Sequence, residues 1–178
     1  MGEMNIAYWG ELRTSSRCGR LDQACAFGVR PNLMIFDGDE VEVKAITVKK
    51  HLYWVFADLC ATKDTIKILR DLNKGYPFPS DEKERLEHMA LGEWNKEIVD
   101  KAIKYMADGE PESLGLLMTE AEYMFNKYVA PMSSDLEAPK LASVLNDSNI
   151  KPLIYGGKGV GSHGDGSVQF LARDKESQ

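Results

Sequence analysis

The sequence predicts an α+β protein in which helices lie on one side of a largely antiparallel sheet. Three observations predict this class. Leu33 and Ile35 alternate with Asn32 and Met34 before a turn, and Val41, Val43 and Ala45 alternate with charged residues after it. This is the pattern of a β-hairpin with one buried face. Helical spacing of apolar residues dominates from residue 62 to residue 145. Two short strand-like segments follow it, separated by a glycine-rich run.

The first fifty residues contain two helical segments and the hairpin. Residues 3–12 predict the end of a helix, and Thr14-Ser15-Ser16 suits the cap of a second helix over residues 18–27. In the hairpin, Asp37-Gly38-Asp39 is the turn, and the apolar positions of residues 41–45 alternate with charged ones.

A strand and several helices follow. Leu52–Ala57 is nearly all apolar and rich in aromatic and β-branched residues, which predicts a central strand covered on both sides. Helices are expected over residues 62–72, from Ser80 onward, over Pro111–Tyr128 and over residues 136–145. The expected buried face of the first helix comprises Ile66, Leu69 and Leu72. Pro152–Tyr155 and Val168–Ala172 predict the last two strands.

Composition excludes several classes of protein. The chain has 178 residues, of which 43% are apolar, and a formal charge of −6. A globular core is therefore expected, whereas a nucleic-acid partner is not, because Lys and Arg form no basic face. No apolar run is long enough to span a membrane. Three cysteines without framework spacing and the lack of a signal-like start predict reduced thiols and a cytoplasmic location.

The run from Gly156 to Gly166 is the most informative feature, with six glycines in eleven residues. Glycines are unfavourable in backbone entropy, so close approach to a ligand is one reason for them. Without Cβ atoms, successive N–H groups can line a nest around an anion. The competing interpretation is a mobile connector between two strands.

Known glycine motifs fail in context. Gly159, Gly161 and Gly164 satisfy G-x-G-x-x-G, but the chain ends before the helix, strand and acidic residue of a dinucleotide fold. A Walker loop needs Ser or Thr after Lys158, and Gly159 stands there. The catalytic motifs of protein kinases do not follow either.

Two separate segments resemble the GHMP kinases, the family of galactokinase, homoserine kinase, mevalonate kinase and phosphomevalonate kinase. Residues 161–167, Gly-Ser-His-Gly-Asp-Gly-Ser after Lys158, resemble the third motif of the family. Residues 19–23, Gly-Arg-Leu-Asp-Gln, resemble the G-x-x-D-Q segment of its sugar-kinase branch. His163 and Asp165 stand where the third motif has glycines, and no segment matches the first phosphate loop of the family.

The resemblance implies a fold and a division of the chain. Residues 51–178 are expected to form the ferredoxin-like C-terminal domain, and residues 1–50 the end of the N-terminal domain. It also implies ATP and Mg²⁺ as cofactors, and an alcohol or sugar as the small-molecule substrate. A complementary N-terminal chain or a homodimer is the expected protein partner.

The resemblance also implies roles for individual residues. Asp22 would accept or orient the proton of the acceptor hydroxyl, and Arg20 would neutralise phosphate or keep Asp22 ionised. Asp58, at the end of a strand, and Gly161 would bind substrate together with Asp22. The residues implied for nucleotide binding are Lys158, Gly161, Ser162, Gly164 and Gly166. No protein metal site is expected, since His51, His88 and His163 lack partners at ligand spacing.

Three functions remain open from the sequence. The first is an ATP-dependent kinase for a sugar or a related alcohol. The second is a non-catalytic relative that binds a small ligand or a complementary chain, and the third is an unrelated α+β protein. Because no first phosphate loop is found, we expect the 178-residue chain alone to lack substantial kinase activity.

Overall fold

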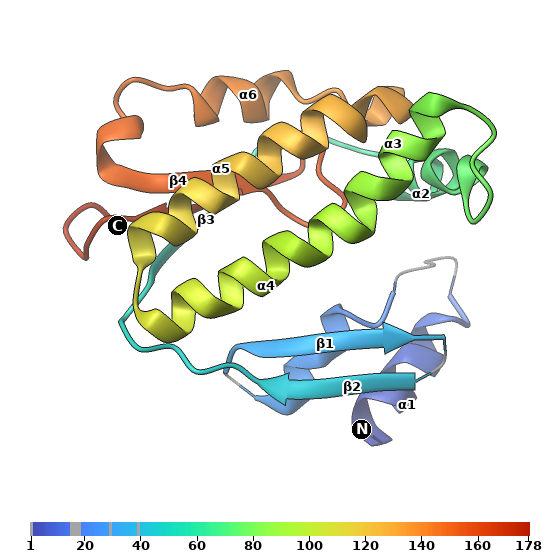
Figure 1. Ribbon diagram of the computed structural model, residues 1–178, viewed down its shortest axis with the longest axis horizontal. Helices are drawn as coiled ribbons and strands as arrows, with labels where there is room; N and C mark the ends of the chain where they lie inside the picture. Colours follow the sequence, from blue (N-terminus) through green and yellow to red (C-terminus); the bar gives the residue numbers. More distant parts are fainter. Residues whose placement is uncertain (1, 15–18, 29, 39) are drawn as a thin grey trace. The chain divides into compact units, whose positions relative to one another are not determined.

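The structure, a computed structural model, describes residues 2–14, 19–28, 30–38 and 40–178 (Figure 1). It divides into two compact units, Met1–Val48 and Lys49–Gln178. Among the described residues, no helix combines the length and the apolar character that crossing a bilayer requires.

The first unit contains the expected hairpin. Strands β1 (Asn32–Asp37) and β2 (Glu40–Ala45) pair antiparallel, with Asp37 opposite Glu40. Helix α1 spans Gly2–Glu11. The helix expected over residues 18–27 is instead a 3₁₀ turn, η1 (Asp22–Phe27), and residues 15–18 lie outside the described part of the chain.

The second unit is built on a three-stranded antiparallel sheet with the order β3-β5-β4. The strands are β3 (Tyr53–Asp58), β4 (Ile154–Gly159) and β5 (Ser167–Ala172). The prediction that the strand around Leu52–Ala57 is central was wrong, because β3 lies at the sheet edge and Phe56 is 64% exposed. The strand covered on both sides is β5.

Alternate residues of β5 face two different cores. Leu171 packs with Leu114 and Met118 of α5 (Pro111–Tyr128). Val168 and Phe170 pack instead with Leu141 of α6 (Pro139–Leu145). Helices therefore cover both faces of the sheet, and the expectation of a one-sided helical layer was wrong.

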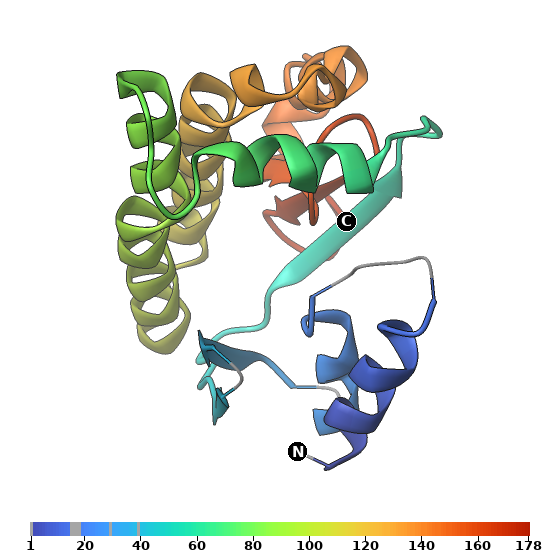
Figure 2. The same ribbon diagram turned by 90° about the vertical axis from the view of Figure 1, so that its right-hand side faces the viewer.

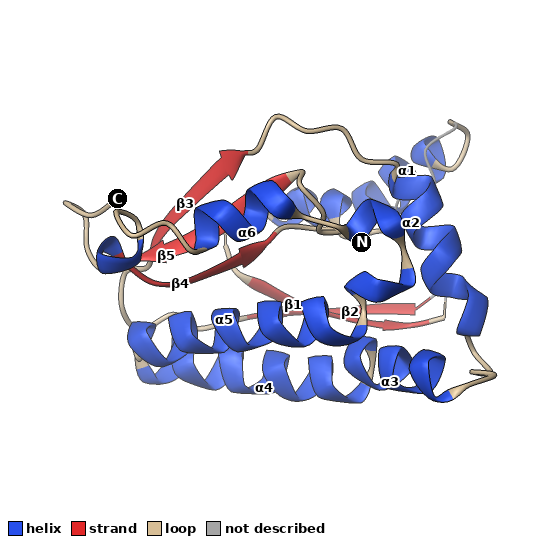
Figure 3. Ribbon diagram, turned by 90° about the horizontal axis from the view of Figure 1, so that it is seen from above, coloured by secondary structure: helices blue, strands red, loops and turns tan. Residues whose placement is uncertain are grey.

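The longest helices form one layer. Helix α4 (Glu93–Asp108) lies beside α5, and α5 runs along β4 (Figures 2 and 3). Helix α3 (Glu82–Leu91) precedes them, capped by Asp81 rather than by Ser80. The Asp81 side chain accepts the N–H of Glu84, while Ser80 donates to the Glu84 carboxylate.

Helix α2 (Thr65–Leu72) buries a different face from the one expected. Ile68 is fully buried against Val129 and Leu136, whereas Ile66 is 53% exposed. The helix starts at Thr65, after its cap Asp64, and rests on the segment that follows α5. Because α2 packs on this segment, the side of the helix that carries Ile68 is the buried side.

Candidate functional site

The first glycines of the run from Gly156 to Gly166 are needed for packing. They belong to strand β4, not to a loop as the sequence had predicted. A Cβ atom on Gly156 would lie 1.8 Å from the carbonyl oxygen of Gly115 in α5. A Cβ on Gly157 would lie 2.5 Å from the ring of Phe170. Glycine lets helix and strand approach closely here, so these positions do not require a ligand.

Lys158 lies on the same strand and is half-buried. Its ammonium donates to the carbonyl oxygen of Gly159 over 2.7 Å. Burial lowers the pKa of Lys158, and the carboxylate of Glu122 opposes that shift. Its role as a nucleotide ligand stays a prediction, and the structure shows the side chain holding the end of β4.

The part of the run that forms a loop is Val160–Gly166. Gly161 is exposed, has a φ of +60° and has no atom within 4 Å of a Cβ position. Gly164 has a φ of +67° and is buried against the carbonyl oxygen of Asp135. Within the described chain, the N–H groups of Gly161, Ser162 and Gly164 have no hydrogen-bond acceptor. Unpaired amides in a tight loop are suited to an anion.

His163, which replaces a glycine of the family motif, turns into the core. It is 6% exposed, and its ring stacks on Phe125 at 3.6 Å between centroids. Its Nδ1 lies 3.4 Å from the Glu122 carboxylate. Burial lowers the pKa of His163 against the pull of that carboxylate, which favours the neutral imidazole near pH 7. Its φ of +59° is unusual for a residue with a side chain, and such strain occurs at functional sites.

Glu122 of α5 fixes the start of the loop. Its carboxylate accepts the N–H of Gly159 at 2.9 Å and the side-chain amide of Asn126 at 2.9 Å. Burial alone would raise the pKa of Glu122, but His163 and the Gly159 N–H outweigh it and lower the pKa. A buried carboxylate with several donors stays ionised and holds loop and helix together.

Asp165, which also stands where the family motif has a glycine, has hydrogen-bond donors of its own. Its carboxylate accepts the backbone N–H groups of Lys140 at 3.1 Å and Leu141 at 2.8 Å. These N–H groups belong to the first turn of α6, so Asp165 caps that helix. Its charge is thereby partly compensated, which reduces the repulsion toward an anion at the loop.

Lys63 is a loop contact that sequence reasoning missed. Its ammonium donates to the carbonyl oxygen of His163 at 2.7 Å, and a Cβ on Gly166 would lie 2.8 Å from it. Burial lowers the pKa of Lys63. Within the described residues, no carboxylate lies within ion-pair distance of this ammonium. The one feature of the sequence that could have indicated Lys63 is its position directly before a capped helix and shortly after Asp58.

Asp58 lies at the same end of the sheet as the loop. It is paired in register with Ser167, and the next residue, Leu59, donates its N–H to the Gly166 carbonyl at 3.0 Å. The Asp58 carboxylate accepts the N–H of Cys60 at 2.9 Å. Cys60 has a φ of +51°, so strained residues occur in both neighbouring loops. The structure thus brings Asp58 close to the loop, and its role in substrate binding stays a prediction.

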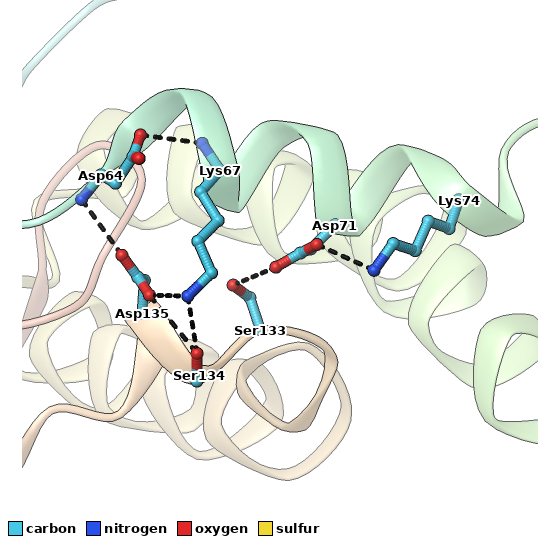
Figure 4. A network of polar contacts seen from close by, with 7 residues as sticks. All are labelled: Asp64, Lys67, Asp71, Lys74, Ser133, Ser134 and Asp135. Atoms are coloured by element: carbon cyan, nitrogen blue, oxygen red, sulfur yellow. Dashed lines mark hydrogen bonds and ion pairs between the residues drawn. The ribbon is translucent and has the colours of Figure 1, made fainter.

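A polar network ties α2 to the wall of this site (Figure 4). Asp64 caps α2 by accepting the N–H of Lys67, and its own N–H donates to Asp135. The Lys67 ammonium contacts Asp135 and donates to Ser134. The same segment, through the Asp135 carbonyl, borders Gly164.

The far end of the network is more buried. The Ser133 hydroxyl donates a hydrogen bond to the Asp71 carboxylate at 2.8 Å. The Lys74 ammonium forms an ion pair with the same carboxylate at 2.8 Å. An open hollow of about 580 Å³ lies at the other end, lined by residues 62–66 and Asp135. The network therefore holds a polar concavity in place next to the glycine loop.

Asp22 and Arg20 belong to the first unit. Asp22 is exposed and begins η1. The Arg20 guanidinium lies over the ring of Tyr8, 4.7 Å from its centroid. Their assigned roles stay predictions. Among the residues that the structure describes, no three His, Cys, Asp or Glu side chains group closely enough to hold a metal ion.

Solved structures supply the comparison with known proteins, since no family model and no curated protein matches the sequence. Mevalonate kinase of L. major, in complex with R-mevalonate, is 20% identical with a TM-score of 0.77, covering 98% of this chain and 50% of its own. Galactokinase of Lactococcus lactis, in complex with galactose, is 12% identical with a TM-score of 0.63. That match covers 88% of this chain and 47% of the galactokinase.

A third match is the Lin0012 protein of Listeria innocua, 14% identical with a TM-score of 0.62 over 77% of this chain and 36% of that protein. The chain thus spans half or less of the length of the structures that it matches. Mevalonate kinase and galactokinase are both GHMP kinases. The chain therefore has the GHMP kinase fold that its two motifs predicted, with the α+β character of the C-terminal domains of that family.

Proposed function

We propose that this chain forms part of the active site of an ATP-dependent kinase that phosphorylates an alcohol group of a small molecule. The observation that carries the proposal is the loop Val160–Gly166, which presents unpaired N–H groups beside the Lys63 ammonium. This arrangement occurs on a fold shared with two small-molecule kinases. Phosphoryl transfer depends mainly on positioning and on stabilising negative charge.

Each group has a defined contribution in this proposal. The amides of Gly161, Ser162 and Gly164 hydrogen-bond phosphate oxygens, and Lys63 neutralises charge at the inner side of the loop. Gly166 leaves room for the Lys63 side chain. Mg²⁺ is usually held by phosphates and one or two carboxylates rather than by a full protein cage. Among the carboxylates near the loop, Asp58 bonds only to a neighbouring N–H, so it fits that task.

We propose that Asp22 takes the proton of the acceptor hydroxyl and that Arg20 supports its ionised form. The Gly-Arg-Leu-Asp-Gln segment favours a sugar or sugar derivative as the acceptor. The reduced thiols expected from the sequence favour the cytoplasm as the site of the reaction.

The proposed activity needs a segment that holds the remaining ATP phosphates. The matched kinases are about twice as long as this chain. We propose that a first phosphate loop, on the same polypeptide or on a complementary chain, completes the site. The alternative is a non-catalytic module that keeps the fold and binds a small ligand, and the same experiment separates the two.

The experiment is a kinase assay on a panel of sugars and related alcohols. It compares the 178-residue chain alone with the chain joined to, or mixed with, the polypeptide that carries the phosphate loop. We expect turnover only in the second case, and its loss in Asp22→Asn. Turnover by the isolated chain would contradict the need for a second segment. Absence of turnover from every completed form would support the non-catalytic alternative.

A further inference from the structure

Helix α3 buries a carboxyl group of which one oxygen has no hydrogen-bond partner in the described part of the chain. Glu87 is 2% exposed, and its Oε1 atom is buried without a hydrogen bond in the described structure. Burial raises the pKa of Glu87 to about 7, nearby Glu84 raises it further and Lys83 opposes the shift. An unsatisfied buried carboxyl group destabilises the folded state. Such a group calls for an explanation.

Glu87 lines a cavity of about 340 Å³, formed by the end of α2, the following 3₁₀ turn η2 (Asn73–Gly75) and helix α3. Leu69, Leu72 and Leu91 supply apolar walls, and the rings of Tyr76 and His88 lie 5.5 Å apart at its side. A cavity of this size with apolar walls and a few polar groups is typical of small-molecule sites.

Glu84 supplies a second carboxylate to the cavity lining, and this carboxylate already accepts hydrogen bonds from Ser80. Its Oε2 accepts the backbone N–H and the hydroxyl of Ser80, each at 2.7 Å. Its side chain packs against Gly75, where a Cβ atom would come within 2.8 Å. Glu84 is therefore held in the wall, while the Oε1 atom of Glu87 is left for a donor. Among the residues that the structure describes, no Lys or Arg lines the cavity.

We propose that this cavity binds a small organic amine, whose ammonium group donates a hydrogen bond to Glu87 and whose apolar body lies against the leucines. Two carboxylates and no lining Lys or Arg favour a cation. The rings of Tyr76 and His88 add favourable surface for it. An anionic ligand would meet two negative groups, and a neutral alcohol would make a weaker hydrogen bond than an ammonium.

The proposal predicts a link between binding and protonation. An ammonium ligand prefers the ionised form of Glu87, so affinity increases as pH rises through about 7. The other titratable groups that line the site are Tyr76, Glu84 and His88, with Lys83 near Glu87 on the same helix. Because charged neighbours also lie near the site, Glu87→Gln is needed to isolate the contribution of the carboxyl group.

The test uses the full 178-residue chain and hexylammonium as the probe. Calorimetry compares it with 1-hexanol and hexanoate, which share its apolar length, while amide NMR shifts of Gly75 and Gly92 locate the site. The variants are Glu87→Gln and Glu87→Met, and Glu97→Gln on the exposed side of α4 is the matched control. Thermal unfolding of each variant confirms that it is folded.

We expect hexylammonium to bind the wild-type chain and the Glu97→Gln variant equally. We expect at least about tenfold weaker binding to both Glu87 variants, as for loss of a charged hydrogen bond. Hexanol should bind more weakly and hexanoate least. Equal binding of hexanol and hexylammonium, unchanged binding in Glu87→Gln, or shifts located away from Gly75 and Gly92 would each overturn the proposal.

Discussion

Two buried glutamates in the second unit differ in almost every respect except their burial. Glu122 on α5 is 5% exposed and bonds to Gly159 and Asn126. Glu87 on α3 is 2% exposed and leaves one oxygen unpaired. The pKa of Glu122 is lowered, whereas that of Glu87 is raised to about 7. Burial alone therefore does not decide the charge of a carboxyl group, because its donors do.

The comparison separates a structural role from a binding role. Glu122 stabilises the glycine loop, because its hydrogen bond to the Gly159 N–H joins α5 to the end of β4, and its carboxylate lies 3.4 Å from His163 Nδ1. Glu87 lies on a cavity wall, and its Oε1 atom has no hydrogen-bond partner among the described residues. A group that lowers stability without a structural partner is a candidate for function.

Removing Glu122 should produce the largest effect. Glu122→Ala leaves the Gly159 N–H and the Asn126 amide without their acceptor, and we expect a loss of about 3 kcal/mol in the free energy of unfolding. Urea denaturation measures it, with exposed Glu120→Ala on the same helix as the control. A loss no larger than that of the control would mean that Glu122 is not a structural anchor.

Replacing Glu87 should act in the opposite direction. Glu87→Met keeps the approximate volume and removes the unpaired carboxyl group, so we expect a gain of about 1–2 kcal/mol in the free energy of unfolding. The same denaturation experiment detects it. A marked loss of stability in Glu87→Met would show that the carboxyl group has a structural partner after all.

The two groups should also give opposite dependences on pH. The folded state binds the proton of Glu87 more tightly than the unfolded state, so stability falls as pH rises from 4.5 to about 7. Glu122 stabilises the fold at neutral pH, and this contribution is lost as pH falls below its ordinary value of 4.5. We expect changes on the order of 1 kcal/mol. Unfolding curves of Glu87→Met should lack the decline between pH 4.5 and 7, and its persistence would contradict the assignment.

The smallest expected effect concerns Asn126. Its side-chain amide donates one of the bonds to Glu122. Asn126→Ala should lower the free energy of unfolding by about 0.5–1 kcal/mol, since Gly159 still bonds to Glu122. Thermal unfolding at neutral pH checks this value. A loss as large as that in Glu122→Ala would mean that the loop depends on the amide rather than on the carboxylate.

Local patterns predicted much of the fold. The β1–β2 hairpin follows from the turn signal Asp37-Gly38-Asp39 and from the alternation of apolar and charged residues over residues 40–45. Helix α5 follows from apolar spacing after Pro111. The edge position of β3 could not be predicted, because a nearly all-apolar strand suits a central position. Strand order depends on long-range pairing with β5, which no local pattern records.

The sequence predicted the site only in part, again because local patterns do not record contacts between distant residues. Composition marked the glycine run, but it could not separate Gly156, which packs on Gly115, from Gly161, which is exposed. Only the fold shows which glycines meet another backbone. Lys63 and Glu122 were missed because their contacts with the loop join residues far apart in the chain.

The most direct test of the proposed kinase role is titration of the chain with Mg²⁺ and ATP, followed by amide NMR shifts. We predict shifts at Gly161, Ser162 and Gly164, and at least about tenfold weaker binding in Lys63→Ala but not in the exposed control Lys101→Ala. Absence of shifts in the loop, or equal binding by Lys63→Ala, would contradict the assignment of this loop as a phosphate site.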